Sequence, residues 1–358
     1  MVYLANLEGD GLVFTYGLFG VQHTELTSDK KQLISSLYGL LSQSADRIDH
    51  LQEESHDVPR ESPKSTTFVA YWVKSQEYEE WKETEAVQEF WTNLPDDAGV
   101  WREVMTVPKS RYMFAANQYE PCGLAAMLGL KDSSDEAYWG VYRHRLSQTP
   151  DEHTDPTDTF TSPLVTATKA KPDSNKQAVD LTKPSTSNEI RKGKVKLTKL
   201  PDNLCYCREG QRQPNLSEDE LETWLEKLAP FAKSWMNHLD TNRNKVGVVS
   251  FAFNIGHDKR KAQFDPGADL ALDTDAIAES NQLMYFLDLA HFELAGRSFK
   301  DHVKLRQTTL EMYGPGGPHG SDGKLSLFVE LCVLKSGDLD AEYVGCKEGT
   351  GLMVLENL

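Results

Sequence analysis

The order of strand-like and helical segments occurs twice along this chain of 358 residues, and this repetition restricts the folds open to it. In the first half, apolar runs predict strands and helical spacing predicts helices in the order 12–22 (strand), 30–44 (helix), 66–73 (strand), 78–92 (helix) and 100–107 (strand). The second half gives strands at 203–207, 246–255, 282–287 and 324–335, with helices at 217–239 and 297–313. Two such halves with antiparallel pairing predict an α+β protein built from a duplicated ferredoxin-like unit.

One long segment does not fit this plan. Residues 147–200 are rich in Ser, Thr, Pro, Asp and Lys and contain few large apolar residues. Such a segment cannot bury enough surface to offset its ordering entropy, so we expect a mobile polar insertion. It separates an N-terminal half, residues 1–146, from a C-terminal half, residues 201–358.

Charge and cysteine content exclude several classes of partner. The net charge of −17 opposes binding to nucleic acid or to anionic membrane surfaces, because both require clustered cations. No apolar run approaches the roughly 20 residues that cross a bilayer, and the chain starts without a secretory signal pattern. The five cysteines are scattered and do not suggest a disulfide framework, so we expect a reducing, cytoplasmic location.

Residues 283–305 predict a buried strand that runs into an amphipathic helix presenting His302 near apolar residues. A neutral imidazole offered from a helix into an apolar pocket is a common way to hold haem iron. A single helical histidine is more often an ordinary core or surface residue. His291, about three helical turns earlier, is a competing ligand. There is no C-x-x-C-H sequence, so any haem is held without covalent attachment.

Six separate segments, taken in order, resemble the haem-containing aldoxime dehydratases. They are FGVQ at 19–22, FVAYW at 68–72 with Trp81 and Trp91 after it, WREV at 101–104, YWGVYRHR at 138–145, NLCYCREGQ at 203–211, and residues 287–302. The resemblance covers nearly the whole chain outside residues 147–200. The cluster of Trp72, Trp81 and Trp91 is expected first of all to consist of core or dimer-interface aromatic residues.

The resemblance implies a haem b protein of the dimeric α/β barrel type, usually a homodimer, acting on a small molecule. It places the iron ligand at His302, with Phe299 and Lys300 replacing the family's first histidine and proline in H-P-T-H. The implied reaction is a lyase reaction that removes water from an aldoxime and leaves a nitrile. The substrate nitrogen binds the iron while a distal acid protonates the leaving hydroxyl.

The distal residues depart from the family pattern. Val329 stands where the family has its acid histidine, and Glu209 stands where it has a serine that holds the oxime oxygen. Arg143 matches the family's distal arginine, although an arginine in this position is equally suited to a structural ion pair. Strand alternation predicts that Cys205, Cys207 and Glu209 share one face.

These departures leave three functions open. Glu209 could replace both lost groups and act as the proton donor, because burial raises the pKa of a carboxyl, although Arg143 would oppose that shift. Alternatively, Glu209 and Arg143 could form the distal pair of a haem oxidoreductase that splits peroxide. The third function is haem binding without catalysis.

Overall fold

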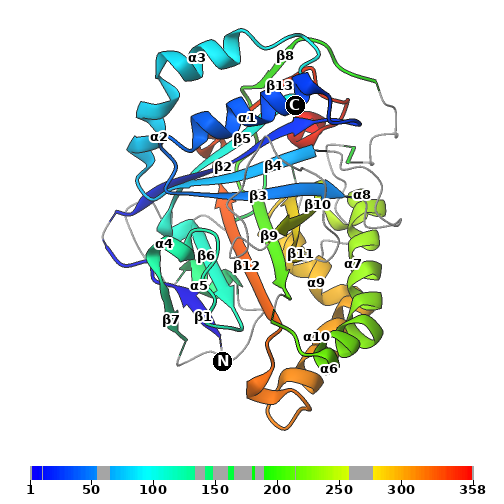
Figure 1. The fold of residues 1–358 in the computed structure, drawn as a ribbon. Helices are drawn as coiled ribbons and strands as arrows, with labels where there is room; N and C mark the ends of the chain where they lie inside the picture. Colours follow the sequence, from blue (N-terminus) through cyan, green and yellow to red (C-terminus); the bar gives the residue numbers. More distant parts are fainter. Residues whose placement is uncertain are drawn as a thin grey trace.

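The computed structural model describes residues 2–9, 11–54, 65–133, 142–147, 160–164, 180–181, 189–213, 215–257 and 277–356. These residues form an α+β fold around one large sheet of thirteen strands (Figure 1). Every strand pair in it is antiparallel. Within these ranges, no helix combines the length and the apolar character that a bilayer crossing requires.

The first half contributes four adjacent strands in the order β3-β4-β2-β5. They are β2 (Val13–Gln22), β3 (Arg47–Glu54), β4 (Ser65–Trp72) and β5 (Val100–Pro108), connected through the helices α1 (Ser28–Leu41), α2 (Ser75–Lys82) and α3 (Glu85–Thr92). The predicted strands at 12–22, 66–73 and 100–107 are confirmed. The helix predicted over 78–92 is two helices, and β3 was missed because its sequence, RIDHLQEE, is mostly polar.

The second half repeats this order as β12-β9-β11-β10. Its strands are β9 (Leu204–Arg212), β10 (Val248–His257), β11 (Ile277–Phe286) and β12 (Ser326–Leu334). Its helices are α6 (Glu218–Thr223), a π-helical turn (Trp224–Leu228), α7 (Ala229–Thr241), α8 (Arg243–Val246), α9 (Leu289–Ser298) and α10 (Lys300–Tyr313). A capping box formed by Ser217 and Glu220 starts α6, as the sequence predicts.

The halves are joined edge to edge and also exchange strands. Strand β10 pairs with β3, which makes the sheet continuous. The outer strands of the sheet are β1 (Tyr3–Ala5), β6 (Tyr112–Ala116) and β7 (Leu130–Asp132) beside β12, and β13 (Leu339–Val344) and β8 (Lys194–Leu197) beside β5. The remaining elements are α4 (Ala125–Leu128), α5 (Tyr142–Ser147) and 3₁₀ turns at Lys109–Arg111, Gly320–Asp322, Ser336–Asp338 and Gly351–Leu355.

The predicted mobile insertion at 147–200 lies largely outside the described residues. Its last part is strand β8, which pairs with β13, so the prediction is wrong there. The sequence KVKL alternates, and Val195 and Leu197 are buried while the two lysines face solvent. Four residues are enough to extend a sheet when their apolar side chains meet an existing core.

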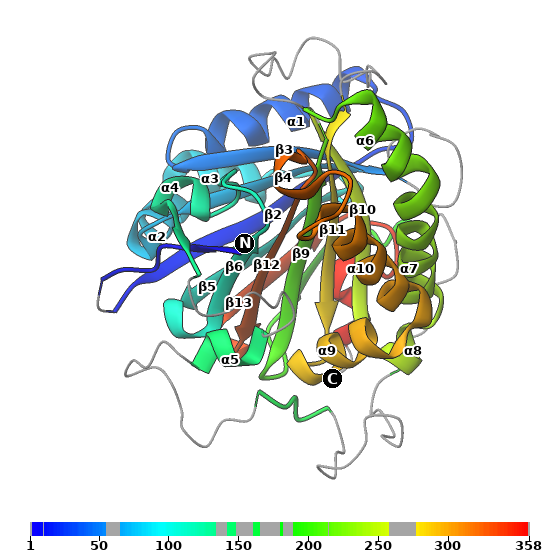
Figure 2. The same cartoon turned by 90° about the horizontal axis from the view of Figure 1, so that it is seen from below.

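The two parts of the sheet pack against each other, and their inner faces form the main core. The Tyr16 Oη of β2 lies 2.9 Å from Cys332 Sγ of β12. The Tyr16 ring contacts the rings of Tyr71 and Tyr206. Figure 1 shows the first-half strands crossing those of the second half. The outer faces are covered by α1–α3 on one side and by α7, α9 and α10 on the other (Figure 2). Trp72 of β4, Trp81 of α2 and Trp91 of α3 belong to one buried core cluster, so of the two expectations the core one is confirmed.

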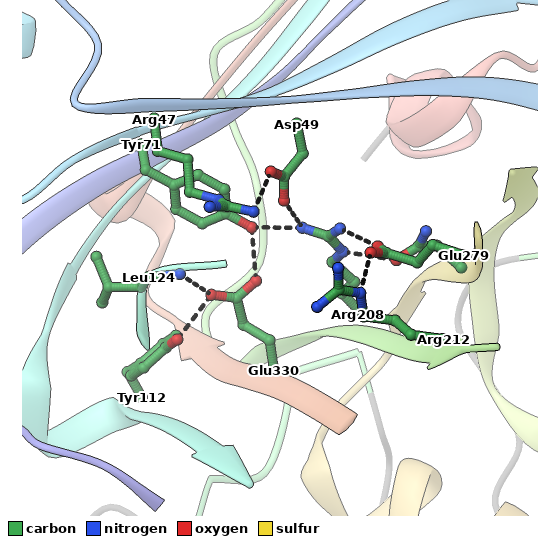
Figure 3. Close-up of polar contacts among 10 residues, drawn as sticks. Arg47, Asp49, Tyr71, Tyr112, Leu124, Arg208, Arg212, Glu279 and Glu330 are labelled. Atoms are coloured by element: carbon green, nitrogen blue, oxygen red, sulfur yellow. Dashed lines mark hydrogen bonds and ion pairs between the residues drawn. The ribbon is translucent and has the colours of Figure 1, made fainter. Parts of the chain in front are cut away.

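A buried guanidinium links the two inner faces (Figure 3). Arg208 of β9 has no exposed surface and donates to Asp49 Oδ2 at 2.8 Å and to Tyr71 Oη at 2.7 Å, both from the first half. Its other terminal nitrogen donates to Glu279 Oε1 of β11 at 2.9 Å, and its Nε donates to Asn281. All the polar nitrogens of this side chain are therefore paired.

A buried carboxyl continues the same network. Glu330 of β12 accepts hydrogen bonds from Tyr71 Oη at 2.8 Å, from Tyr112 Oη at 2.6 Å and from the backbone N–H of Leu124 at 3.3 Å. Burial raises the pKa of Glu330, and the charge of Arg208 and these hydrogen bonds oppose the rise. Strands of both halves thus share one polar cluster inside the core.

Replacing Arg208 with methionine is expected to lower the free energy of unfolding by about 3–5 kcal/mol, because Asp49 and Glu279 would stay buried without this cation. Urea unfolding followed by far-UV circular dichroism measures the loss. Arg191→Met is the control, since Arg191 pairs with Glu356 at the partly exposed surface. Such a pair is worth less than about 1 kcal/mol. Equal losses in the two variants would contradict the role given to Arg208.

Candidate functional site

A cavity of about 1850 Å³ lies between the outer face of the second-half sheet and the helices α7, α9 and α10. It exceeds the roughly 300–1,000 Å³ of ordinary ligand pockets, so it has room for a large cofactor together with a small substrate. The four residues singled out from the sequence, His302, Glu209, Val329 and Arg143, all line it. They come from four different elements of the fold.

A break between two helices sets the position of His302. The helix predicted over 297–313 is interrupted at Phe299, whose backbone is extended. His302 follows in the first turn of α10, and its Nδ1 donates to the carbonyl of Gly296 at 2.5 Å. A Cβ at position 296 would stand 3.3 Å from His302 Cε1, so glycine lets the two helices meet closely here.

This hydrogen bond fixes the imidazole for metal binding. A carbonyl accepts only from a protonated nitrogen, so the proton is on Nδ1 and the lone pair is on Nε2. Within the described ranges, Nε2 has no hydrogen-bond partner. Burial lowers the pKa of His302 to about 4; the Gly296 carbonyl opposes the shift and the charge of Arg306 adds to it. The ring is therefore neutral near pH 7.

The competing histidine is engaged elsewhere. His291 is buried, and its Nδ1 lies 2.7 Å from Oδ1 of Asp288, the N-cap of α9. It does not belong to the cavity lining in the described part of the chain. Of the two candidate ligands, only His302 has access to the cavity.

Glu209 and Val329 are direct cross-strand partners on β9 and β12. Val329 is buried in the helix-side core together with Cys205 and Cys207, which confirms the predicted shared face. Burial raises the pKa of Glu209 to about 7. The Trp235 indole N–H and the charge of Arg306 act in the opposite direction and lower this pKa. A substantial fraction of this carboxyl is therefore protonated at neutral pH.

Arg143 lies in helix α5 and pairs with Glu293, not with Glu209 as the sequence predicts. Its Nη2 is 3.3 Å from Glu293 Oε2 of α9, and its guanidinium is 5.9 Å from the Phe160 ring. The cation that lowers the pKa of Glu209 is Arg306, so the expectation that Arg143 does so is wrong.

Two further residues near His302 were missed by sequence reasoning. Trp235 of α7 is almost fully buried, and its ring centroid lies 4.3 Å from that of His302. The indole N–H of Trp235 lies on the side of Glu209, but its geometry does not meet that of a hydrogen bond to this carboxyl. Trp235 Nε1 therefore has no hydrogen-bond partner in the described ranges. Arg306 follows His302 by one helical turn, and this spacing alone could have identified it. Nothing in the local sequence distinguishes Trp235.

The donor set fits an iron porphyrin. The site offers a neutral imidazole with Nε2 unbonded, an apolar wall that includes Phe292, Leu305 and Phe328, and a volume suited to a large planar ring. All five cysteines are buried and unpaired, so no thiolate is better placed to serve as an axial ligand.

Comparisons with known proteins agree with this geometry. A family model described as haem-containing dehydratase matches residues 17–352. The chain is 23% identical to phenylacetaldoxime dehydratase of Bacillus sp. (strain OxB-1) over 298 residues, which is 81% of this chain and 74% of the relative. It is 21% identical to aliphatic aldoxime dehydratase of Rhodococcus erythropolis over 84% of this chain and 74% of that one.

The fold is also shared with solved structures. A crystal structure of an aldoxime dehydratase in complex with butyraldoxime superposes with a TM-score of 0.76 at 19% sequence identity. The match covers 99% of this chain and 89% of the other. At this level of identity, the likeness shows a common fold.

The raised pKa of Glu209 predicts a pH-dependent stability difference. Between about 4.5 and about 7 the folded protein keeps a proton that the unfolded chain releases, so this carboxyl contributes less stability as pH rises. Relative to wild type, Glu209→Gln should therefore become more stable between pH 5 and pH 8, by at most about 3 kcal/mol. Urea unfolding of both proteins at the two pH values measures this difference.

His302→Asn is the counterpart variant with the opposite sign. The pKa of His302 is lowered in the folded state, so its contribution to stability grows as pH rises from about 4 to 6.5. In haem-free protein, the asparagine variant should lose stability relative to wild type over that range. Parallel trends in the two variants would show that burial does not control these groups.

Proposed function

The chain belongs to the haem-containing dehydratase family, and from this membership we propose that it converts an aldoxime into a nitrile and water. The proposal rests mainly on one observation. His302, Glu209 and Val329, which lie far apart in the sequence, line one cavity in which the imidazole offers an unbonded Nε2. The substrate class comes from the relatives, which are aldoxime dehydratases.

His302 is the residue that would hold the haem iron. When bound, the haem supplies an iron to which the oxime nitrogen can coordinate. The Gly296 carbonyl holds the imidazole in one tautomer and raises its basicity as a donor. The Trp235 ring packs on the imidazole and restricts its rotation.

Glu209 is the proposed proton donor. Hydroxide is a poor leaving group, and proton donation at the transition state typically contributes about 10²–10⁴-fold. A carboxylic acid whose pKa is near 7 is well matched to this task. As the N–O bond breaks, Glu209 gives its proton to the departing oxygen, which leaves as water. The carboxylate so formed can accept the proton of the aldoxime carbon, and this restores the acid and closes the C≡N bond.

The peroxide-splitting alternative has less support, because the distal pair that it requires is divided. Arg143 pairs with Glu293, whereas Glu209 faces Arg306 and Trp235. Haem binding without catalysis is separated from the lyase function by the assays below.

We also propose that residues 1–146 and 201–358 are two copies of a ferredoxin-like unit. The support is the strand order, fourth-first-third-second in each half. The homodimer implied by the family resemblance is part of the proposal, and light scattering after size-exclusion chromatography tests it. Five unpaired cysteines favour a reducing compartment, the cytoplasm.

Glu209→Gln should lower aldoxime turnover about 10²–10⁴-fold while leaving the Soret band unchanged, because only the proton donor is lost. Dithionite-reduced protein is mixed with an aldoxime, and nitrile is followed by gas chromatography. The wild-type rate should fall as pH rises above about 7, where Glu209 loses its proton. His302→Ala should alter or abolish the Soret band. Wild-type turnover in Glu209→Gln would refute the assignment of the acid.

Val329→His should raise turnover, since it places an imidazole directly across the strand pair from Glu209. The added volume in a packed core should cost about 1–3 kcal/mol of stability. Val329→Leu is the matched control, because it enlarges the side chain without adding a proton donor. If both variants change turnover equally, the effect is steric.

A further inference from the structure

A row of side chains from neighbouring strands crosses the cavity at the level of Glu209. The direct cross-strand partner of Glu209 is Val329 of β12 on one side and Gln282 of β11 on the other. Gln282 in turn pairs with Phe253 of β10. All four residues line the cavity. Directly opposed residues of an antiparallel pair have Cβ atoms about 4.5–5.5 Å apart, so the Gln282 amide can reach an atom that Glu209 also reaches.

Gln282 is the polar one of the two side chains that flank Glu209. The Val329 side chain can neither donate nor accept a hydrogen bond, and Phe253 on the far side of Gln282 is apolar. A carboxamide offers two N–H donors and one oxygen acceptor, and it carries no charge. Such a neutral donor can hold a ligand oxygen without lowering the pKa of the neighbouring carboxyl, whereas a lysine or arginine in this position would lower it.

The oxygen of the Gln282 amide has no structural partner in the described part of the chain. The side chain is half-buried, and its Oε1 is covered without a hydrogen bond. Asn117, which lines the same cavity, differs: its amide donates to the carbonyl of Leu325 at 2.9 Å and accepts from the N–H of Leu327 at 2.7 Å. The Asn117 amide is therefore structural, whereas the N–H end of the Gln282 amide is available to a ligand in the cavity.

We propose that the Gln282 side-chain N–H donates a hydrogen bond to the oxime oxygen and holds this oxygen against Glu209. The assignment rests on the proposed function and deepens it. The family resemblance places the residue that holds the oxime oxygen at position 209, where this chain has its acid. Gln282 is adjacent to that position on the next strand, so it can take over the holding contact.

The hydrogen bond contributes most as the N–O bond breaks. The bonding electrons move to the oxygen, its negative charge grows, and the proton from Glu209 neutralises that charge as water leaves. A donor that already faces this oxygen stabilises the charge without reorganisation. Gln282 therefore acts mainly on kcat, whereas Glu209 supplies the proton.

Two apolar variants, Gln282→Met and Gln282→Leu, test the assignment. Each should lower kcat for butyraldoxime about 10²-fold and change KM little, because a donor to the developing charge is lost. The pH above which turnover falls should stay near 7, since Glu209 keeps its surroundings. Neither variant should unfold at a lower urea concentration than wild type, because no paired group loses its partner.

Ligand binding separates contact with the oxygen from contact with the rest of the molecule. Soret titration of dithionite-reduced protein gives Kd for butyraldoxime and for butylamine, which has the same carbon chain and an iron-binding nitrogen but no oxygen. Both variants should raise Kd for butyraldoxime about three- to tenfold and leave Kd for butylamine unchanged. Equal changes for the two ligands, or wild-type kcat in both variants, would overturn the assignment of Gln282 while the proposed function stands.

Gln213→Leu is the matched control. Gln213 also lines the cavity, but it follows the end of β9 and lies about 13 Å from Glu209 along the strand direction. The same loss of an amide there should leave kcat and both Kd values at the wild-type level, and a loss equal to that of Gln282→Leu would overturn the assignment. If wild type forms no nitrile and butyraldoxime leaves its Soret band unchanged, the proposed function itself fails, and the role of Gln282 fails with it.

Discussion

The buried guanidinium of Arg208 is the contact on which the arrangement of this protein depends. It joins carboxylates and a tyrosine from both halves of the sheet at a point with no access to water. Desolvating such a group is costly, and only complete pairing offsets that cost. Since successive side chains of a strand alternate in direction, fixing Arg208 toward the inner core turns Glu209 toward the helices. The structural cluster and the candidate site are therefore set by adjacent residues of β9.

Burial in the cavity acts on two titratable groups in opposite directions. It lowers the pKa of His302 to about 4 and raises that of Glu209 to about 7. In both cases the low dielectric disfavours the charged form. A neutral imidazole suited to a metal and a carboxyl suited to donating a proton thus follow from the same physical cause. The charge of Arg306 opposes the rise in the pKa of Glu209.

The departures from the family pattern fall at positions that face each other. The resemblance places the family's acid histidine and serine at Val329 and Glu209, and the structure makes these two residues cross-strand partners. A proton donor lost from one strand can therefore be replaced by a residue of the neighbouring strand. This exchange of roles is physically reasonable because Val329 and Glu209 are adjacent in the sheet. Their separation in the sequence does not reveal that adjacency.

The sequence by itself determined the elements whose own residues carry the pattern. Largely apolar runs located β2, β5 and β12. Ser217 and Glu220 located the start of α6, and alternation placed Cys205, Cys207 and Glu209 on one face. The family resemblance placed the expected iron ligand at His302. Tertiary structure alone decided the polar strand β3, the break at Phe299, and the partners of Arg143 and Trp235. Periodicity reports only how a segment divides its own side chains between core and solvent. Which charged residues pair depends on how strands and helices that are distant in sequence lie against each other. Short stretches of sequence do not specify that arrangement.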